Sequence, residues 1–140
     1  FHRTVNMRLP ILTRGLGLAY FAFASKEEQD FIVSILQKSD DPEAALARNP
    51  ERLEKIVQQI RAQGFATRPA DIEPKNSNTI AVPMFNGENR VVASLGLTYF
   101  RSAFASTKEA TERYVPVLKG ASNEITVDLV RLSKATQITA

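Results

Sequence analysis

The clearest hydrophobic pattern in this chain lies between residues 79 and 100. Large apolar residues occupy every second position on both sides of a short polar segment: Ile80, Val82, Met84, Val91, Ala93, Leu95 and Leu97. Successive side chains of a β-strand point to opposite faces, and Asn86-Gly87-Glu88-Asn89 has the residues of a turn. The pattern predicts an antiparallel hairpin with one apolar face and one face of small or hydroxylated residues.

The register of this hairpin follows from where its turn is centred, between Gly87 and Glu88. A two-residue Gly87-Glu88 turn and a four-residue loop give the same pairing. The predicted pairs are Thr79 with Gly96, Ala81 with Ser94, and Ser77 with Thr98. The small, hydroxylated face is then a shallow floor that can hold a small ligand.

Two helices are predicted before residue 40. Residues 10–24 are apolar on nearly every side, as in a helix packed between layers. Ser25 and Glu28 have the spacing of a capping box, which predicts a second helix through Phe31, Ile32, Ile35 and Leu36. Pro42 follows its expected end.

Two more helices have clear end signals. Asn49 as the cap, Pro50 in the first turn and Gly64 after the last turn predict the third helix. Ser106 and Glu109 form another capping box, which opens a long helix that Pro116 is expected to kink. Residues 65–67 resemble a short strand, and residues 68–78 a loop that could cover a site.

The fold class follows from this order of elements: three helices, a strand, the loop, the hairpin and a long helix. With 140 residues and 44% hydrophobic content, the chain is sized for one domain. We therefore predict an α+β fold with a central antiparallel sheet flanked by helices.

Composition narrows the function classes. The 18 basic and 15 acidic residues are mostly interspersed, and the basic excess lies in Arg3, Arg8 and Arg14. No interleaved aromatic residues accompany these arginines, so nucleic-acid contact within this segment is not indicated. The longest uncharged run, residues 15–25, is shorter than a membrane span, so no membrane partner is expected. The chain begins at Phe1, which suggests a piece of a longer protein.

Catalytic and metal-binding groups are scarce. The chain has no cysteine and one histidine, His2, so disulfides, thiolate nucleophiles and histidine triads are not expected. The absence of cysteine fits a reducing, cytoplasmic compartment. Paired acids occur only at Glu27-Glu28 and Asp40-Asp41, in helix-end or loop contexts where acids cap or solvate. We predict neither an enzyme nor a cofactor.

The Gly15-Leu16-Gly17 segment has two open interpretations. It resembles the start of a dinucleotide fingerprint, but Tyr20 stands where the third glycine belongs. The glycines could instead let an anion approach free backbone N–H groups at the start of the helix, at Thr13 or Arg14. The alternative is close packing of the helix against the sheet.

Four segments in this order resemble the C-terminal effector-binding domain of IclR-type bacterial transcriptional regulators, a GAF-like fold. They are Arg8-Leu9-Pro10 with Gly15-Leu16-Gly17, Ile60-Arg61-Ala62-Gln63-Gly64-Phe65, Ile80-Ala81-Val82-Pro83 with Val92-Ala93-Ser94-Leu95, and the last helix. Phe1-His2-Arg3 before Arg8 also resembles the branch that regulates hydroxyphenylpropionate and related aromatic catabolism.

The resemblance implies an effector site and a missing DNA-binding part. Gly15 and Leu16 would offer backbone N–H groups to a carboxylate, Thr79 and Thr98 would offer hydroxyls, and Gly96 would leave space. Either Arg68 or Asp71 would face the ligand from the loop. Phe85, Phe100, Met84 and Tyr99 would line an aromatic pocket or belong to the core.

We therefore expect residues 1–140 to be a ligand-sensing domain of a transcription factor that binds a small, carboxylate-bearing metabolite, with an aromatic acid as one alternative. By the resemblance, the full-length protein is a homodimer or homotetramer. It contacts operator DNA through a helix-turn-helix domain upstream of this segment, and the first strands of the sensing domain are missing as well. The alternative is an oligomerisation module without a ligand pocket.

Overall fold

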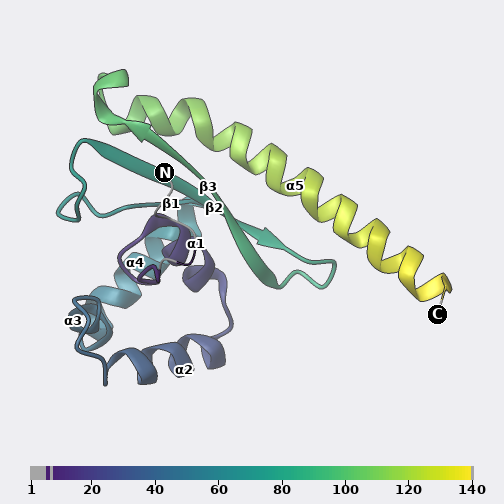
Figure 1. The fold of residues 1–140 in the computed structure, drawn as a ribbon, viewed down its shortest axis with the longest axis horizontal. Coiled ribbons are helices and arrows are strands. Elements are labelled where there is room, and N and C mark those ends of the chain that lie inside the picture. The colour runs from purple at the N-terminus through teal and green to yellow at the C-terminus, as the bar shows by residue number, and fades with distance from the viewer. Residues whose placement is uncertain (1–5, 7, 140) are drawn as a thin grey trace.

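The computed structural model describes residue 6 and residues 8–139. Figure 1 shows a sheet with a long helix across one face and a group of shorter helices on the other. The helices are α1 (Gly15–Phe23), α2 (Lys26–Leu36), α3 (Ala44–Ala47), α4 (Pro50–Gln63) and α5 (Thr107–Thr139), with a 3-10 turn, η1, at Arg101–Ala103. The strands are β1 (Ala66–Thr67), β2 (Ser77–Phe85) and β3 (Val91–Phe100).

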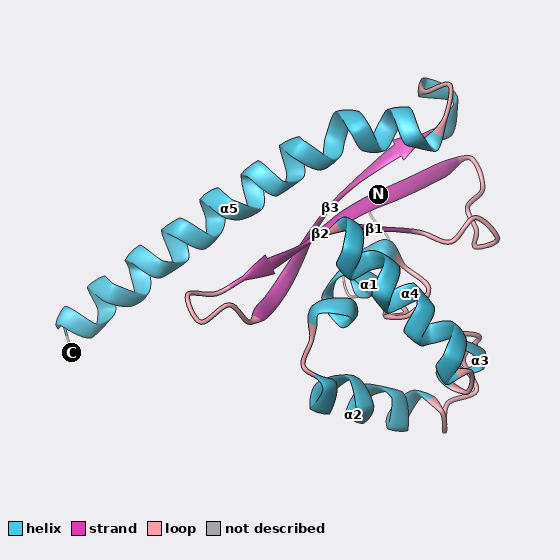
Figure 2. Ribbon diagram, turned by 180° about the vertical axis from the view of Figure 1, so that it is seen from behind, coloured by secondary structure: helices cyan, strands magenta, loops and turns pink. Residues whose placement is uncertain are grey.

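The sheet is antiparallel with the order β1-β2-β3. Seen from both sides, α5 covers one face while α1 and α4 lie on the other, and α2 stands farther from the sheet (Figure 2). This arrangement confirms the predicted α+β class with a central antiparallel sheet flanked by helices.

The predicted hairpin register is wrong by two residues. Thr79 pairs with Thr98, Ala81 with Gly96, Pro83 with Ser94, and Ser77 with Phe100. Three residues separate Asn86 from Arg90, whose carbonyl accepts a hydrogen bond from the Asn86 amide at 2.9 Å, whereas the predicted turn had two or four. The ladder is also irregular between Met84 and Phe85, and each of these two differences shifts the register by one residue. A slip of two residues keeps each side chain on its predicted face, so the division into two faces is correct.

The predicted helix ends agree with the structure at the capping residues. The Ser25 hydroxyl accepts a hydrogen bond from the Glu28 amide at 3.2 Å, and the Asn49 side chain accepts one from the Arg52 amide at 3.2 Å. Gly64 ends α4 in the left-handed conformation with φ of 81°. The Ser106 hydroxyl likewise accepts from the Glu109 amide. These short-range bonds explain why the sequence located the helices.

Three features of the helices differ from prediction or were missed. The first helix begins at Gly15 rather than at residue 10, and its N-cap is Arg14, which agrees with the predicted start at Thr13 or Arg14. The four-residue α3 and η1 were not predicted, because they are too short for a periodic pattern. Pro116 lies inside α5, which continues as one helix to Thr139, and the kink expected there stays a prediction.

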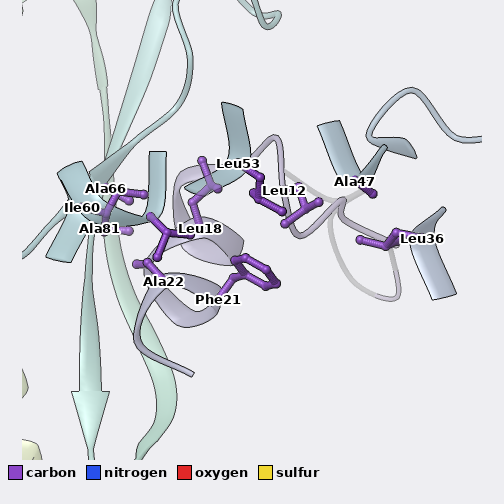
Figure 3. Packing of buried hydrophobic residues seen from close by; sticks show 12 residues of the cluster. Leu12, Leu18, Phe21, Ala22, Leu36, Ala47, Leu53, Ile60, Ala66 and Ala81 are labelled. Carbon is purple, nitrogen blue, oxygen red and sulfur yellow. The ribbon is translucent and has the colours of Figure 1, made fainter. Parts of the chain in front are cut away.

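Two groups of buried side chains hold the layers together. In Figure 3, Leu18 and Ala22 of α1 lie near Ile60, Ala66 and Ala81, on the side of the β-sheet. The other group lies between the sheet and α5 and contains Ile80, Val82, Tyr99, Ala110 and Leu118. The apolar face of the hairpin therefore packs against α5, and the small-residue face turns toward α1.

Candidate functional site

The start of α1 lies directly against the sheet at Gly15. A Cβ atom on Gly15 would be 3.2 Å from the Thr79 carbonyl oxygen and 3.5 Å from the Arg68 nitrogen. Such a contact is tighter than most side chains allow, so glycine permits the helix to begin beside β1 and β2. This packing brings Gly15, Arg68 and Thr79 together, although they are far apart in the sequence.

The two predicted threonines meet on the same face of the sheet. Their hydroxyl oxygens are 2.9 Å apart and share a hydrogen bond. Thr98 is exposed and Thr79 is half-buried. Leu16 covers the next step of the strand, since a Cβ on Gly96 would lie 2.7 Å from its Cδ2 atom. Leu16 is itself 37% exposed, so this hydroxyl face is open rather than an enclosed cavity.

The N-terminus of α1 carries an uncompensated positive end. Within residues 6 and 8–139, no side chain caps the helix. Its first turn has no acidic residue, and its first helical bond runs from the Leu18 amide to the Arg14 carbonyl at 2.9 Å. The earlier amides of a helix have no partner within it, and the helix dipole favours an anion there. A Cβ on Gly17 would lie 2.2 Å from the Ile11 carbonyl oxygen, so that glycine serves packing.

Arg68 fastens the loop after β1 to the start of β2. Its side chain is 5% exposed, and Nη2 donates to the carbonyls of Pro74 (2.6 Å) and Ser77 and to the Ser77 hydroxyl at 3.2 Å. Burial lowers the pKa of Arg68, and the positive charges of Arg14 and Arg101 lower it further. Arg68 therefore belongs to a group of three arginines.

Arg101, which we did not predict as a site residue, joins this group because of the strand pairing. Its amide donates to the Asn76 carbonyl at 2.9 Å, and its Nε to the Ser77 carbonyl at 3.3 Å. Arg14 reaches the same segment, since its Nη1 donates to the Glu73 carbonyl at 3.0 Å. No local motif marks Arg101, because only the pairing of Ser77 with Phe100 places it there.

The structure separates Asp71 from Arg68, the two alternatives for the loop. Asp71 is exposed and lines a hollow of about 420 Å³ bounded by α4 and the segment before α1, with Leu18, Ile60 and Ile72 among its apolar walls. Arg68 instead contacts the strand that carries Thr79. Of the seven predicted residues, the structure brings together Gly15, Leu16, Arg68, Thr79, Gly96 and Thr98.

The four candidate pocket residues of the hairpin divide between the two faces. Phe100 alternates with Tyr99, lies on the face of Thr98 and is 67% exposed. Tyr99 is buried beside Phe104 and Tyr114, with ring centroids 5.4 and 6.4 Å away. Met84 is on the α5 face by the same alternation, and Phe85 packs against Phe23 at 5.7 Å. Phe100 is thus the aromatic side chain next to the hydroxyl face.

Other kinds of site find no support in the described part of the chain. Within residues 6 and 8–139, no group of three or more histidine, cysteine or acidic side chains could hold a metal ion. None of the described helices is long and apolar enough to cross a membrane. His2 and Arg3 lie outside the described residues.

Residues 4–127 match the sequence model of the family described as bacterial transcriptional regulator IclR, C-terminal. The chain belongs to the IclR family. It is 30% identical over 77 residues to the Pca regulon regulatory protein of Pseudomonas putida, which covers 55% of this chain and 26% of that protein. It is also 30% identical over 98 residues to the HTH-type transcriptional regulator XynR of Escherichia coli, covering 70% of this chain and 38% of XynR.

Solved structures of this IclR family share the fold. The IclR protein of Thermotoga maritima has a TM-score of 0.71 and 25% identity, over 89% of this chain and 49% of that one. The C-terminal domain of the E. coli transcriptional regulator KdgR has a TM-score of 0.70 and 21% identity, over 89% of this chain and 73% of that one. This chain is therefore an IclR-family C-terminal regulatory domain, and its relatives are transcriptional regulators.

Proposed function

We propose that this domain senses a small carboxylate-bearing effector, aromatic in the preferred case, on the face formed by the start of α1 and the hairpin. The observation that carries the proposal is the exposed Thr79–Thr98 hydroxyl pair beside the uncapped helix start at Gly15. Hydroxyls can donate to a carboxylate, and free helix N–H groups favour an anion. Phe100 offers an apolar surface for a ring.

Effector binding would act on DNA indirectly. The matched relative XynR is named as an HTH-type regulator. This chain spans 38% of XynR and 49% of the Thermotoga maritima IclR protein. By analogy, a helix-turn-helix domain upstream contacts operator DNA, in a cytoplasmic homodimer or homotetramer. An effector changes that assembly only through different affinities for two arrangements. The contacts that α1 and the 68–76 loop make with β2 would differ between these two arrangements.

A ligand screen by thermal unfolding tests the proposal. Aromatic acids and small keto acids are added to the 140-residue chain, and a ligand at about 100 times its Kd should stabilise the fold by about 2.7 kcal/mol. Thr98→Trp should abolish this response with little change in unliganded stability, because Thr98 is exposed. Thr136→Trp, on the distant end of α5, is the matched control and should respond like the parent. No stabilisation by any acid, with the fold intact, would refute the sensing function.

An oligomerisation module without a ligand pocket is the second candidate. It is favoured by exposed apolar residues along the outer half of α5, namely Val127, Leu129, Leu132 and Ile138, which extends past the sheet in Figure 1. Leu129 and Leu132, three residues apart, share one side of the helix, and contiguous exposed apolar side chains mark association sites. Analytical ultracentrifugation of Leu132→Glu distinguishes effector sensing from oligomerisation. Loss of association together with a retained ligand response would show that sensing does not depend on oligomerisation.

A further inference from the structure

Three arginines from separate elements converge on the segment 73–77. Arg14 precedes α1, Arg68 follows β1, and Arg101 follows β3. Each donates to a main-chain carbonyl of this segment through one nitrogen of its guanidinium group. These contacts hold the loop against the start of β2.

Each of these guanidinium groups also has a buried nitrogen that makes none of these bonds. Arg14 Nε, Arg68 Nε and Arg101 Nη2 are buried atoms without a hydrogen-bond partner among the described residues. A buried donor without an acceptor is destabilising, and native proteins have few of them. These three donors are not needed to hold the loop, because other nitrogens of the same arginines already donate to the carbonyls of segment 73–77.

The cluster also lacks a close ion-pair partner in the described part of the chain. None of the ion pairs within 4 Å among the described residues includes Arg14, Arg68 or Arg101. Glu73 attracts Arg68, but its carboxylate pairs with Lys75 at 3.8 Å, where both side chains are exposed. Arginine is the residue that best binds planar oxyanions, through two parallel hydrogen bonds. The cluster therefore has the chemistry of an anion site.

We infer that Arg14, Arg68 and Arg101 form an anion subsite that holds the carboxylate of the effector. Ser77, which the cluster contacts, lies two residues from Thr79 on the same face of β2, a spacing of about 7 Å along a strand. Phe100 pairs with Ser77 across the hairpin. The carboxylate would bind the arginines, the apolar body would lie on Phe100, and a polar group at the other end would reach the hydroxyl pair. The identity of the anion as part of an effector rests on the proposed function.

Matched acid and amide ligands test the subsite. Isothermal titration of the 140-residue chain uses 3-phenylpropionate and the uncharged 3-phenylpropionamide, which differ in charge and little in shape. The acid should bind at least about tenfold more tightly than the amide, as expected for charge-assisted hydrogen bonds. Arg101→Gln and Arg14→Gln should weaken the binding of the acid by at least about tenfold and leave the binding of the amide unchanged. Arg68 is not substituted, because it is 5% exposed and makes three of the hydrogen bonds that hold the loop.

Arg131→Gln is the control for the loss of one positive charge. Arg131 is exposed on α5 and only reaches Asp128 at 4.0 Å, so its removal should leave acid binding unchanged. Sodium sulfate, compared with sodium chloride at equal ionic strength, is an additional probe. Sulfate stabilises proteins in general, so the expected result is a larger rise in melting temperature for the parent and Arg131→Gln than for Arg101→Gln.

The outcomes separate this inference from the proposed function. If the acid and the amide bind equally and Arg101→Gln changes neither, the inference is overturned while ligand sensing stands. If no organic acid binds, including the screened panel, but sulfate distinguishes Arg101→Gln from Arg131→Gln, the anion subsite stands and the proposed function fails. If the arginine variants only lower stability, with unchanged selectivity for acid and sulfate, the arginines serve the loop alone and the inference is overturned.

Discussion

Gly17→Ala provides a sharp test of the packing that places α1 beside the sheet. An added Cβ would lie 2.2, 2.5 and 2.7 Å from the carbonyl oxygen, Cα and carbonyl carbon of Ile11. All three are backbone atoms, so no side chain can rotate away. Ordinary contact begins at 3.4 Å, and the segment would therefore have to move by about 1 Å.

The magnitude follows from what this movement disturbs. The next residue, Leu12, is fully buried, and its amide donates to the Glu43 carboxylate at 2.9 Å. Overpacking a core costs about 1 to 3 kcal/mol, and weakening a hydrogen bond to a charged group costs about 1.5 to 3 kcal/mol. Alanine is better than glycine in a helix by about 1 kcal/mol. We expect Gly17→Ala to lower the free energy of unfolding by about 2 to 4 kcal/mol.

Gly120→Ala is the matched control. Gly120 lies on α5, where an added Cβ meets no atom within 4 Å. The substitution should raise the free energy of unfolding by about 0.5 to 1 kcal/mol, because only helix propensity changes. Urea unfolding followed by far-UV circular dichroism measures both, with the m-value as a check for an unchanged denatured state. A Gly17→Ala variant as stable as the parent, beside a stabilised Gly120→Ala, would refute the close approach of Ile11 to α1.

Two further predictions concern the hydrogen bonds that join layers or helices. Ser122→Ala removes the buried hydroxyl that donates to the Pro83 carbonyl at 2.9 Å. Urea unfolding should show that the free energy of unfolding falls by about 1 to 3 kcal/mol. Ser102→Ala, at an exposed position, is the control and should change this free energy little. The Tyr20 hydroxyl donates to the Glu28 carboxylate at 2.6 Å, and this bond, with burial and the negative charge, raises the pKa of Tyr20 above 10.0. The folded state then keeps the proton longer than the unfolded state, so this stabilisation is complete below pH 10 and is lost as the pH rises through the folded pKa. Tyr20→Phe should flatten that part of the stability profile between pH 9 and 12 as measured by urea unfolding; an unchanged slope would contradict the assignment.

The candidate site shows how far sequence reasoning extends. Gly15, Thr79, Gly96 and Thr98 were predicted because glycine and period-two patterns are visible in a few neighbouring residues. The pattern placed Thr79, Gly96 and Thr98 on one face of the hairpin, and the tertiary structure brought Gly15 to that face. Arg101 was missed because nothing in its neighbours distinguishes it from a solvated charge. Asp71 was predicted with Arg68 because the sequence cannot say which loop residue turns toward the strand.

What the sequence by itself determined is local. Helix caps at Ser25, Asn49 and Ser106 and the two faces of the hairpin depend on hydrogen bonds and alternation within a few residues, and these survive any tertiary arrangement. The tertiary structure alone decided the pairing of Thr79 with Thr98, the approach of Gly15 to β2 and the convergence of three arginines on residues 73–77. Those contacts join segments whose separation is set by turn length and packing, which a local pattern does not encode.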